Sequence, residues 1–95
     1  MAGYAIINNE ITDEALHAEF RDKVAATIEA HGGRYLVRGG ATEVMDGDFT
    51  PGHVVVVEFD SVDQARAWQT SPEYIEAKKM RTKAANANVI IVEGV

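Results

Sequence analysis

The chain of 95 residues has no cysteine, only two prolines and a single tryptophan. Without thiols it can form no disulfide, no thiolate metal site and no cysteine nucleophile, which fits a reducing compartment. It also lacks any segment near the roughly 20 apolar residues of a membrane-spanning helix, and its N-terminus lacks the basic region of a secretory signal. These absences, with the length, predict a single cytoplasmic domain, residues 1–95, with no membrane partner.

Basic side chains are scarce as well. Nine Lys and Arg stand against 15 Asp and Glu, which leaves a net charge of −6. Because nucleic acids are bound through a basic face, nucleic acid is not an expected partner. The late basic residues are predicted to form a solvent-exposed helix face, with an anion site as the alternative; they are Lys78, Lys79, Arg81 and Lys83.

Short apolar runs and capping residues predict the secondary structure. Strands are expected at Tyr4–Asn8, Arg34–Arg38, His53–Phe59 and Val89–Val92, with Ala41–Met45 as a candidate continuation of the second strand. A first helix is expected at Asp13–His31, with a core stripe of Leu16, Phe20, Val24 and Ile28. A second is expected at Ser61–Thr70. A third should begin at Ser71-Pro72 and end near Ala84, before the polar segment Asn86–Asn88. The order β-α-β-β-α-β is that of the ferredoxin-like α+β fold, with an antiparallel four-stranded sheet.

Two strands suggest a partner for the sheet. Val54–Val57 and Val89–Val92 are apolar at every position, whereas a sheet with one wet face alternates apolar and polar residues. Two helices cover only one face, and leaving the other in water forgoes about 1.5–3 kcal/mol for each large side chain. We therefore expect a homodimer packed through the open sheet faces. The alternative is a monomer whose apolar face is a ligand floor.

Short segments along almost the whole chain carry a resemblance to a known family. They are Tyr35–Gly40, Glu43-Val44, Gly47-Asp48, Pro51, Val57–Phe59, Ala65–Trp68, Ser71–Tyr74 and Val92–Gly94. In these segments the chain resembles the DUF1330 family, small proteins of unknown function in the dimeric α+β barrel superfamily. The resemblance implies a ferredoxin-like fold and a sheet-to-sheet dimer, and it supplies no reaction.

The superfamily of that resemblance includes cofactor-free monooxygenases, haem-degrading oxygenases, muconolactone isomerases and stress-responsive proteins. Some haem-degrading members combine an Asn on the first strand, a Trp on the second helix and a His about ten residues later. Asn8 and Trp68 stand in similar places, but Lys78 and Lys79 occupy the place of the His. Without that axial ligand the resemblance does not extend to haem, and no cofactor is expected.

Two residues of the third strand are candidate catalytic groups. His53 opens the strand, and an imidazole with a pKa of about 6.5 can act as an acid or a base. Glu58 lies inside an apolar run, where a carboxylate must be paired or protonated, with Arg38 or Arg81 as the expected partner. The alternatives are a solvated strand-end histidine and a structural ion pair.

Four further residues are candidate ligand-binding groups. Arg38, next to Gly39-Gly40, can hold a small anion beside exposed backbone N–H groups. The alternative is a solvent-facing arginine beside a structural bulge or sharp bend at the two glycines of a longer strand. Trp68, Tyr74 and Tyr35 can form an aromatic wall between helix and sheet, or can simply belong to the core.

Two functions remain open from the residues. The first is a metal-free small-molecule enzyme, of an isomerase or cofactor-free monooxygenase type, acting on a compact oxygenated or aromatic metabolite. The second is a non-catalytic dimeric module that binds a ligand or a partner in a stress response. No metal site is predicted, because His17 and His31 are 14 residues apart and no metal-ligand spacing occurs.

Overall fold

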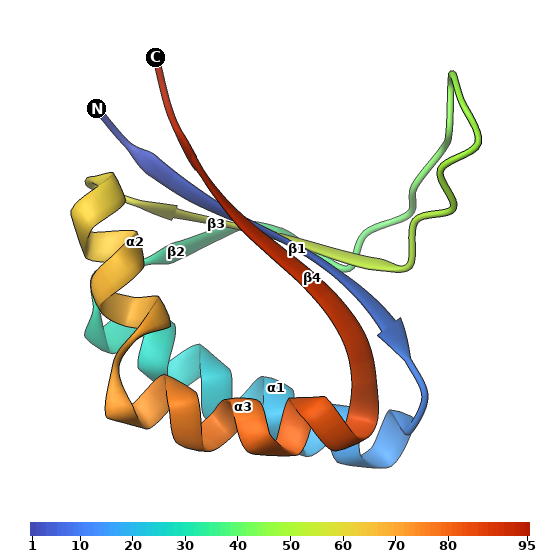
Figure 1. The fold of residues 1–95 in the computed structure, drawn as a ribbon, viewed down its shortest axis with the longest axis horizontal. Helices are drawn as coiled ribbons and strands as arrows, with labels where there is room; N and C mark the ends of the chain where they lie inside the picture. Colours follow the sequence, from blue (N-terminus) through green and yellow to red (C-terminus); the bar gives the residue numbers. More distant parts are fainter.

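The computed structural model describes residues 1–95, which form an antiparallel sheet with all helices on one face (Figure 1). The strands are β1 (Gly3–Ile11), β2 (Arg34–Arg38), β3 (His53–Phe59) and β4 (Ala85–Glu93). The helices are α1 (Glu14–Ala30), α2 (Val62–Gln69) and α3 (Pro72–Ala84). The sheet order is β2-β3-β1-β4, with every neighbouring pair antiparallel. The predicted ferredoxin-like α+β fold is confirmed, with the second helical region divided into two helices.

Each helix begins after a capping side chain, and of the two caps that the sequence allows for the first helix, Thr12 and Asp13, it is Asp13 that takes this role. Asp13 accepts a hydrogen bond of 3.0 Å from the Leu16 N–H, and Ser61 and Ser71 accept from the N–H groups three residues further on. α1 ends at Ala30 with His31 as its C-cap, and Gly32 follows with a φ of 76°, a left-handed conformation that a Cβ would disfavour. Local hydrogen bonding therefore sets the limits of all three helices.

Strands β1 and β4 are longer than predicted. β1 continues past Asn8 to Ile11, and β4 begins at Ala85, directly after α3. Asn8 pairs with Asn88 across the two strands, and the Asn86 side chain donates to Glu10 Oε1 over 3.2 Å. These polar side chains pair with one another on the open face, so the ladder extends through positions that resemble a loop in the sequence.

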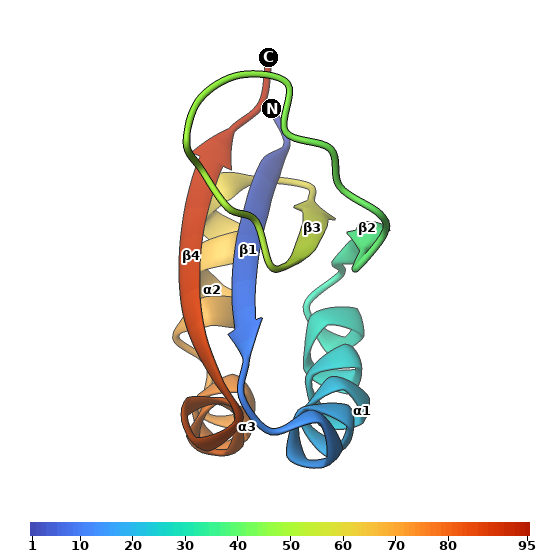
Figure 2. The same ribbon diagram turned by 90° about the vertical axis from the view of Figure 1, so that its right-hand side faces the viewer.

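The segment between β2 and β3, residues 39–52, is an irregular arm that projects beyond the sheet (Figures 1 and 2). The predicted continuation of the second strand at Ala41–Met45 is therefore wrong. β2 ends where Gly39 takes a φ of 73° and turns the chain outward. The bulge lies earlier, between Tyr35 and Val37.

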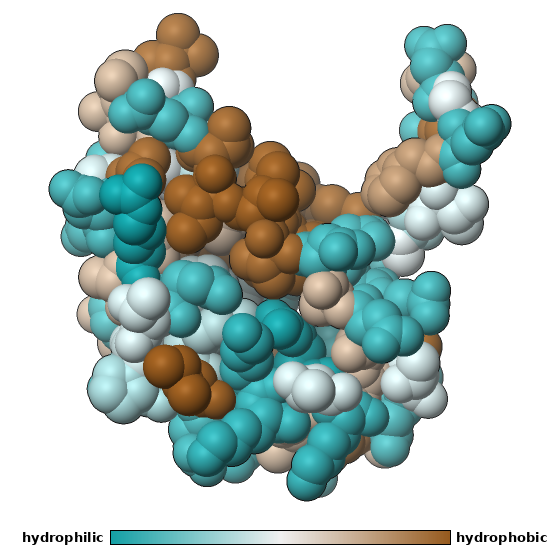
Figure 3. Space-filling view, in the orientation of Figure 1, coloured by the Kyte–Doolittle hydropathy of each residue, from teal (hydrophilic) through white to brown (hydrophobic).

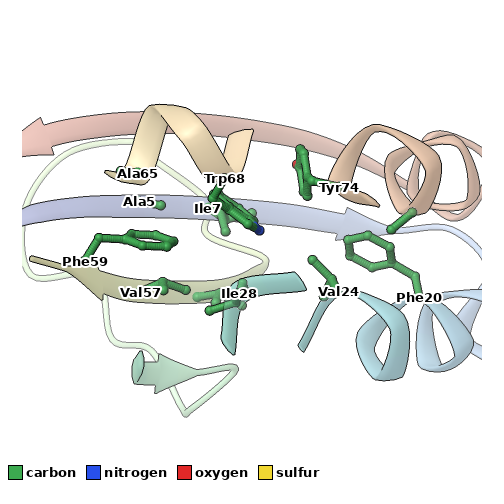
Figure 4. Packing of buried hydrophobic residues seen from close by; sticks show 12 residues of the cluster. Ala5, Ile7, Phe20, Val24, Ile28, Val57, Phe59, Ala65, Trp68 and Tyr74 are labelled. Carbon is green, nitrogen blue, oxygen red and sulfur yellow. The ribbon is translucent and has the colours of Figure 1, made fainter. Parts of the chain in front are cut away.

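The core fills the space between the sheet and the helices, of which α1 and α3 lie side by side (Figure 2). Its largest members are aromatic: the Trp68 and Tyr74 rings lie 4.4 Å apart between centroids, and Phe59 packs on the other side of Trp68 (Figure 4). The remaining apolar members come from β1, β3 and α1–α3: Ala5, Ile7, Phe20, Val24, Ile28, Val55, Val57, Ala65 and Ala77.

One buried hydrogen bond joins α1 to α2. The Trp68 Nε1–H donates to Thr27 Oγ1 over 3.0 Å, and the Thr27 hydroxyl donates to the Val24 carbonyl over 2.8 Å. Trp68 is completely buried, so its N–H has no access to water. The threonine hydroxyl therefore determines how the tryptophan sits in the core.

Replacing Thr27 by valine tests this bond. Thr27→Val preserves the shape of the side chain but removes the acceptor of the buried indole N–H, so the free energy of unfolding is expected to fall by about 1–3 kcal/mol. Chemical denaturation measures the loss. Thr82→Val on the exposed face of α3 is the matched control, because Thr82 also donates to a helix carbonyl, and it should change stability by no more than about 0.5 kcal/mol. Equal effects in the two variants would contradict the assignment.

Candidate functional site

A narrow cavity lies between the sheet and the helices, reaching from the buried core to the side of β2. About 30 Å³ of it is accessible to the centres of water molecules, enough for about two of them. Buried apolar side chains such as Phe20 and Trp68 form its inner wall, and the exposed side chain of Arg38 stands at its outer end.

Five of the six residues named from the sequence line this cavity: His53, Arg38, Tyr35, Trp68 and Tyr74. His53 points toward the helices because it shares a face of β3 with the buried residues two and four positions further on. The bulge in β2 brings Tyr35 and Arg38 to that same face, opposite Val57 and Val55. Arg38 then lies over the Tyr35 ring, 4.5 Å from its centroid.

Glu58, the sixth residue, lies on the opposite, open face of the sheet. Its carboxylate accepts a hydrogen bond of 2.9 Å from the Tyr4 hydroxyl and one of 2.7 Å from Arg34 Nε. The Tyr4 hydrogen bond and then that of Arg34 hold the pKa of Glu58 below its usual range. The expected partners Arg38 and Arg81 are thus wrong, and Glu58 is separated from the cavity by the thickness of the sheet.

His17 is a cavity residue that the sequence interpretation missed. It is 1% exposed, its ring centroid lies 5.4 Å from that of His53, and neither of its ring nitrogens has a hydrogen-bond partner. The core stripe of α1 passes through His17, Phe20 and Val24, whereas Leu16, predicted in that stripe, is only partly buried. The helical spacing in the sequence could have identified His17 as a core residue, because it stands three residues before Phe20 and seven before Val24.

Both cavity histidines are biased toward the neutral form. Burial lowers the pKa of His17 below its usual 6.5, and the neighbouring His53 lowers it further. Burial also lowers the pKa of His53, with a smaller contribution from Arg21. The Nδ1 atom of His53 is buried without a partner, like both nitrogens of His17. At neutral pH the cavity therefore holds two uncharged imidazoles that can accept a proton.

Arg81 and Asn9 complete the polar side of the cavity. Arg81 donates from Nη1 to the Tyr74 hydroxyl over 2.7 Å, while its Nε and the Asn9 Oδ1 are buried without partners. Lys78, Lys79 and Lys83 are exposed, as predicted for the basic helix face, but Arg81 is buried, so this part of the prediction is wrong. Arg81 lies seven residues after Tyr74, on the inner side of α3.

Glycines at the two ends of the arm leave room for the site. A Cβ at Gly39 would collide with the His53 ring, and one at Gly52 would collide with the Asn9 carbonyl oxygen. Gly52 N–H also donates to Asn8 Oδ1 over 2.8 Å. The Arg-Gly-Gly segment thus serves to let the chain pass closely over His53.

Comparison with protein families shows to which family the chain belongs. Residues 2–95 match the model of DUF1330, a domain of unknown function. The chain belongs to the DUF1330 family. No curated protein matches this DUF1330 chain.

Several solved structures share the fold of this DUF1330 protein. A protein of unknown function from Rhodopseudomonas palustris has a TM-score of 0.80 at 19% identity, covering 99% of this chain and 82% of that one. A dimeric ferredoxin-like protein of unknown function from Jannaschia sp. CCS1 has a TM-score of 0.66 at 12% identity, covering 99% and 100%. SnoaB, a cofactor-independent oxygenase from Streptomyces nogalater, has a TM-score of 0.63 at 13% identity, covering 99% and 91%.

At these identities the neighbours establish the ferredoxin-like fold alone. Some of them are described as dimeric, and one as a cofactor-independent oxygenase. In the DUF1330 chain itself, none of the helices has the length and apolar character required to cross a membrane.

The buried histidines predict a pH dependence of stability. Because the pKa of His17 is lowered in the folded protein, the unfolded chain binds protons more readily as the pH falls through 6.5. The free energy of unfolding should therefore fall with decreasing pH from 6.5 to the lowered pKa, while above about pH 7 His17 should contribute no slope. Denaturation of wild type and His17→Asn from about pH 5 to about pH 8 measures this.

The variant is expected to show a shallower acid slope than the wild type, because it lacks the fully buried one of the two cavity imidazoles. His31→Asn is the matched control, since His31 lies at the C-terminal end of α1, outside the cavity. The same slope in His17→Asn and wild type would contradict the role given to burial of this ring.

Proposed function

We propose that this DUF1330 protein is a small-molecule enzyme that works without a metal, transferring a proton to or from a compact oxygenated or aromatic metabolite held in the cavity. The observation that carries the proposal is the facing pair His17 and His53. The two rings lie 5.4 Å apart at the wall of a cavity that is also lined by arginines, and both nitrogens of His17 and the Nδ1 of His53 are buried without a hydrogen-bond partner. Nitrogens left free in this way are available to bind and transfer a proton.

The chemistry follows from the positions of these groups. His53, nearer the outer end, is placed to remove a proton from a carbon beside a carbonyl or from a phenolic hydroxyl. The enolate or phenolate that forms is stabilised by the arginines, and Trp68 and Tyr35 bound the apolar part of the metabolite. Glu58 has no part in this scheme, because it faces the other side of the sheet.

Two outcomes are open to such an enolate. A proton returned to another carbon completes an isomerisation, which needs no oxidant. Alternatively, dioxygen as co-substrate converts the reacting CH₂ group to a carbonyl, with one oxygen atom in the product and the other released as water. The similarity to a cofactor-independent oxygenase supports the second outcome only through the shared fold.

Hydrogen–deuterium exchange tests the step that both outcomes share. The protein is incubated in D₂O containing EDTA with pyruvate, and loss of the methyl C–H signal beside the ketone carbonyl is followed by proton NMR. We expect exchange above the buffer rate and a decrease of about 10²-fold or more in His53→Gln. His31→Gln, outside the cavity, should exchange at the wild-type rate.

Two results would overturn the proposal. One is exchange of pyruvate at the buffer rate. The other is exchange that survives in His53→Gln and in His17→Gln but is lost in Glu58→Gln, because it would move the chemistry to the open face of the sheet.

We also infer that the protein is a homodimer packed through the open face of the sheet. Apolar side chains gather in the hollow between the chain termini and the arm (Figure 3). Exposed members of this face include Val37 of β2 and Ile90 and Val92 of β4, and Val54 and Val56 lie between them on β3. The exposed apolar side chains of the arm, Met45 and Phe49 among them, extend the same surface. The dimeric descriptions of structural neighbours support this arrangement.

A charge placed on the open face tests the dimer. Ile90 is 57% exposed in the single chain, so Ile90→Glu costs the monomer little but places a carboxylate in the proposed interface of about 800 Å² per subunit. Sedimentation equilibrium is expected to give a dimer for the wild type and a monomer for this variant. Ile75→Glu is the control, since Ile75 is 48% exposed on α3, away from the open face, and it should remain dimeric. A monomeric wild type would contradict the inference.

A further inference from the structure

Arg81 is a buried cation without a counter-charge. Its side chain lines the cavity and the residue is 8% exposed. The ion pairs of the structure involve Arg34, Arg66 and Lys79, and none involves Arg81. Its guanidinium donates only to the neutral hydroxyl of Tyr74, and Nε has no acceptor. A guanidinium cannot escape this cost by losing its proton.

The surroundings of Arg81 increase the positive charge of the cavity. Arg21 and Arg38 line the same space. Both histidines there have lowered pKa values, which favours their neutral forms. The acid that acts on these rings is Glu14, which is exposed in the first turn of α1. Three arginines therefore share one cavity in a chain whose net charge is −6. Of the three, Arg81 alone is buried, and a buried cation without a counter-charge destabilises the fold by itself.

An anion that enters the cavity would supply the missing charge. The guanidinium fork matches the two oxygens of a carboxylate, and the unused Nε–H provides one of two parallel hydrogen bonds. The Tyr74 hydroxyl, already in contact with Arg81, can donate to the same carboxylate, and the buried Asn9 amide lines the same cavity beside its strand partner His53. The cavity holds about two water molecules and has an apolar wall, which limits its occupant to an organic acid of few atoms.

We propose that Arg81 anchors the carboxylate of a small organic acid of about the size of acetate or pyruvate, whose carbon chain extends from Arg81 toward His17 and His53. This inference rests on the proposed function and names its substrate class. Arg81 holds the carboxylate, which does not react, and the histidines act on the C–H carbon beside the ketone carbonyl at the other end of the acid. Arg38, at the outer end and close enough to His53 to act on its pKa, is then the arginine that stabilises the enolate.

Anion-dependent stabilisation tests the anchor. The probe is sodium acetate, compared at constant ionic strength with acetamide, which has the same shape and no charge. At acetate tenfold above its dissociation constant, the thermal midpoint of the wild type should rise by on the order of 5 °C, and acetamide should leave it unchanged. Arg81→Met should show no acetate shift, and without acetate its midpoint should not fall below that of the wild type. Arg66→Met, an exposed arginine on α2, is the matched control that keeps the shift.

A second measurement avoids dependence on the variant. In nitrogen-edited NMR spectra of the wild type, the Arg81 Nε–H signal should move with acetate and saturate, and should not move with acetamide. An Arg81 signal that ignores acetate would overturn the inference. So would an acetate shift that survives in Arg81→Met, or stabilisation by inorganic phosphate and not by acetate.

The results also separate this inference from the proposed function. Acetate binding at Arg81 without pyruvate exchange would leave the anchor standing and reject the enzyme. Pyruvate exchange at the wild-type KM in Arg81→Met would leave the enzyme standing and reject the anchor.

Discussion

The alternation of side chains along β3 is the constraint on which the rest of the structure depends. Successive residues of a strand point to opposite faces of the sheet, so His53 and Glu58, five positions apart, cannot reach the same compartment. His53 joins the helix side, where burial depresses the pKa of its ring. Glu58 joins the open side, where Tyr4 and Arg34 keep its carboxylate ionised. The two-residue alternation of the strand thus places some polar residues of the sheet in the cavity and the others on the open face.

The helix side has to serve two opposing requirements. The core must exclude water around Trp68 and Tyr74, because burial of large aromatic surfaces is its main source of stability. The same layer contains His17 and Arg81, both buried and both short of hydrogen-bond partners. Such groups reduce stability, and their concentration at one end of the layer agrees with a site where binding and proton transfer outweigh that loss.

Local signals in the sequence were sufficient for much of the fold. The caps Asp13, Ser61 and Ser71 satisfy N–H groups only three residues away, so a short window contains all the information. The strand continuations were not accessible in this way. Asn86 and its neighbours look like a loop, and they form a strand only because β1 offers a long partner for pairing. Gly39-Gly40 looked like a bulge within a longer strand, and it proved to be the start of the arm.

By itself, the sequence determined the element order, the antiparallel ferredoxin-like sheet and the residues of β3, since these depend on chain-local hydrogen bonds and on the periods of apolar residues. Only the tertiary structure decided which polar residues meet. The β2 bulge brings Tyr35 and Arg38 to one face, and α1 and α3 lie side by side, so that His17 and Arg81 line one cavity. These residues are distant along the chain, and their proximity follows from packing, which no local pattern encodes.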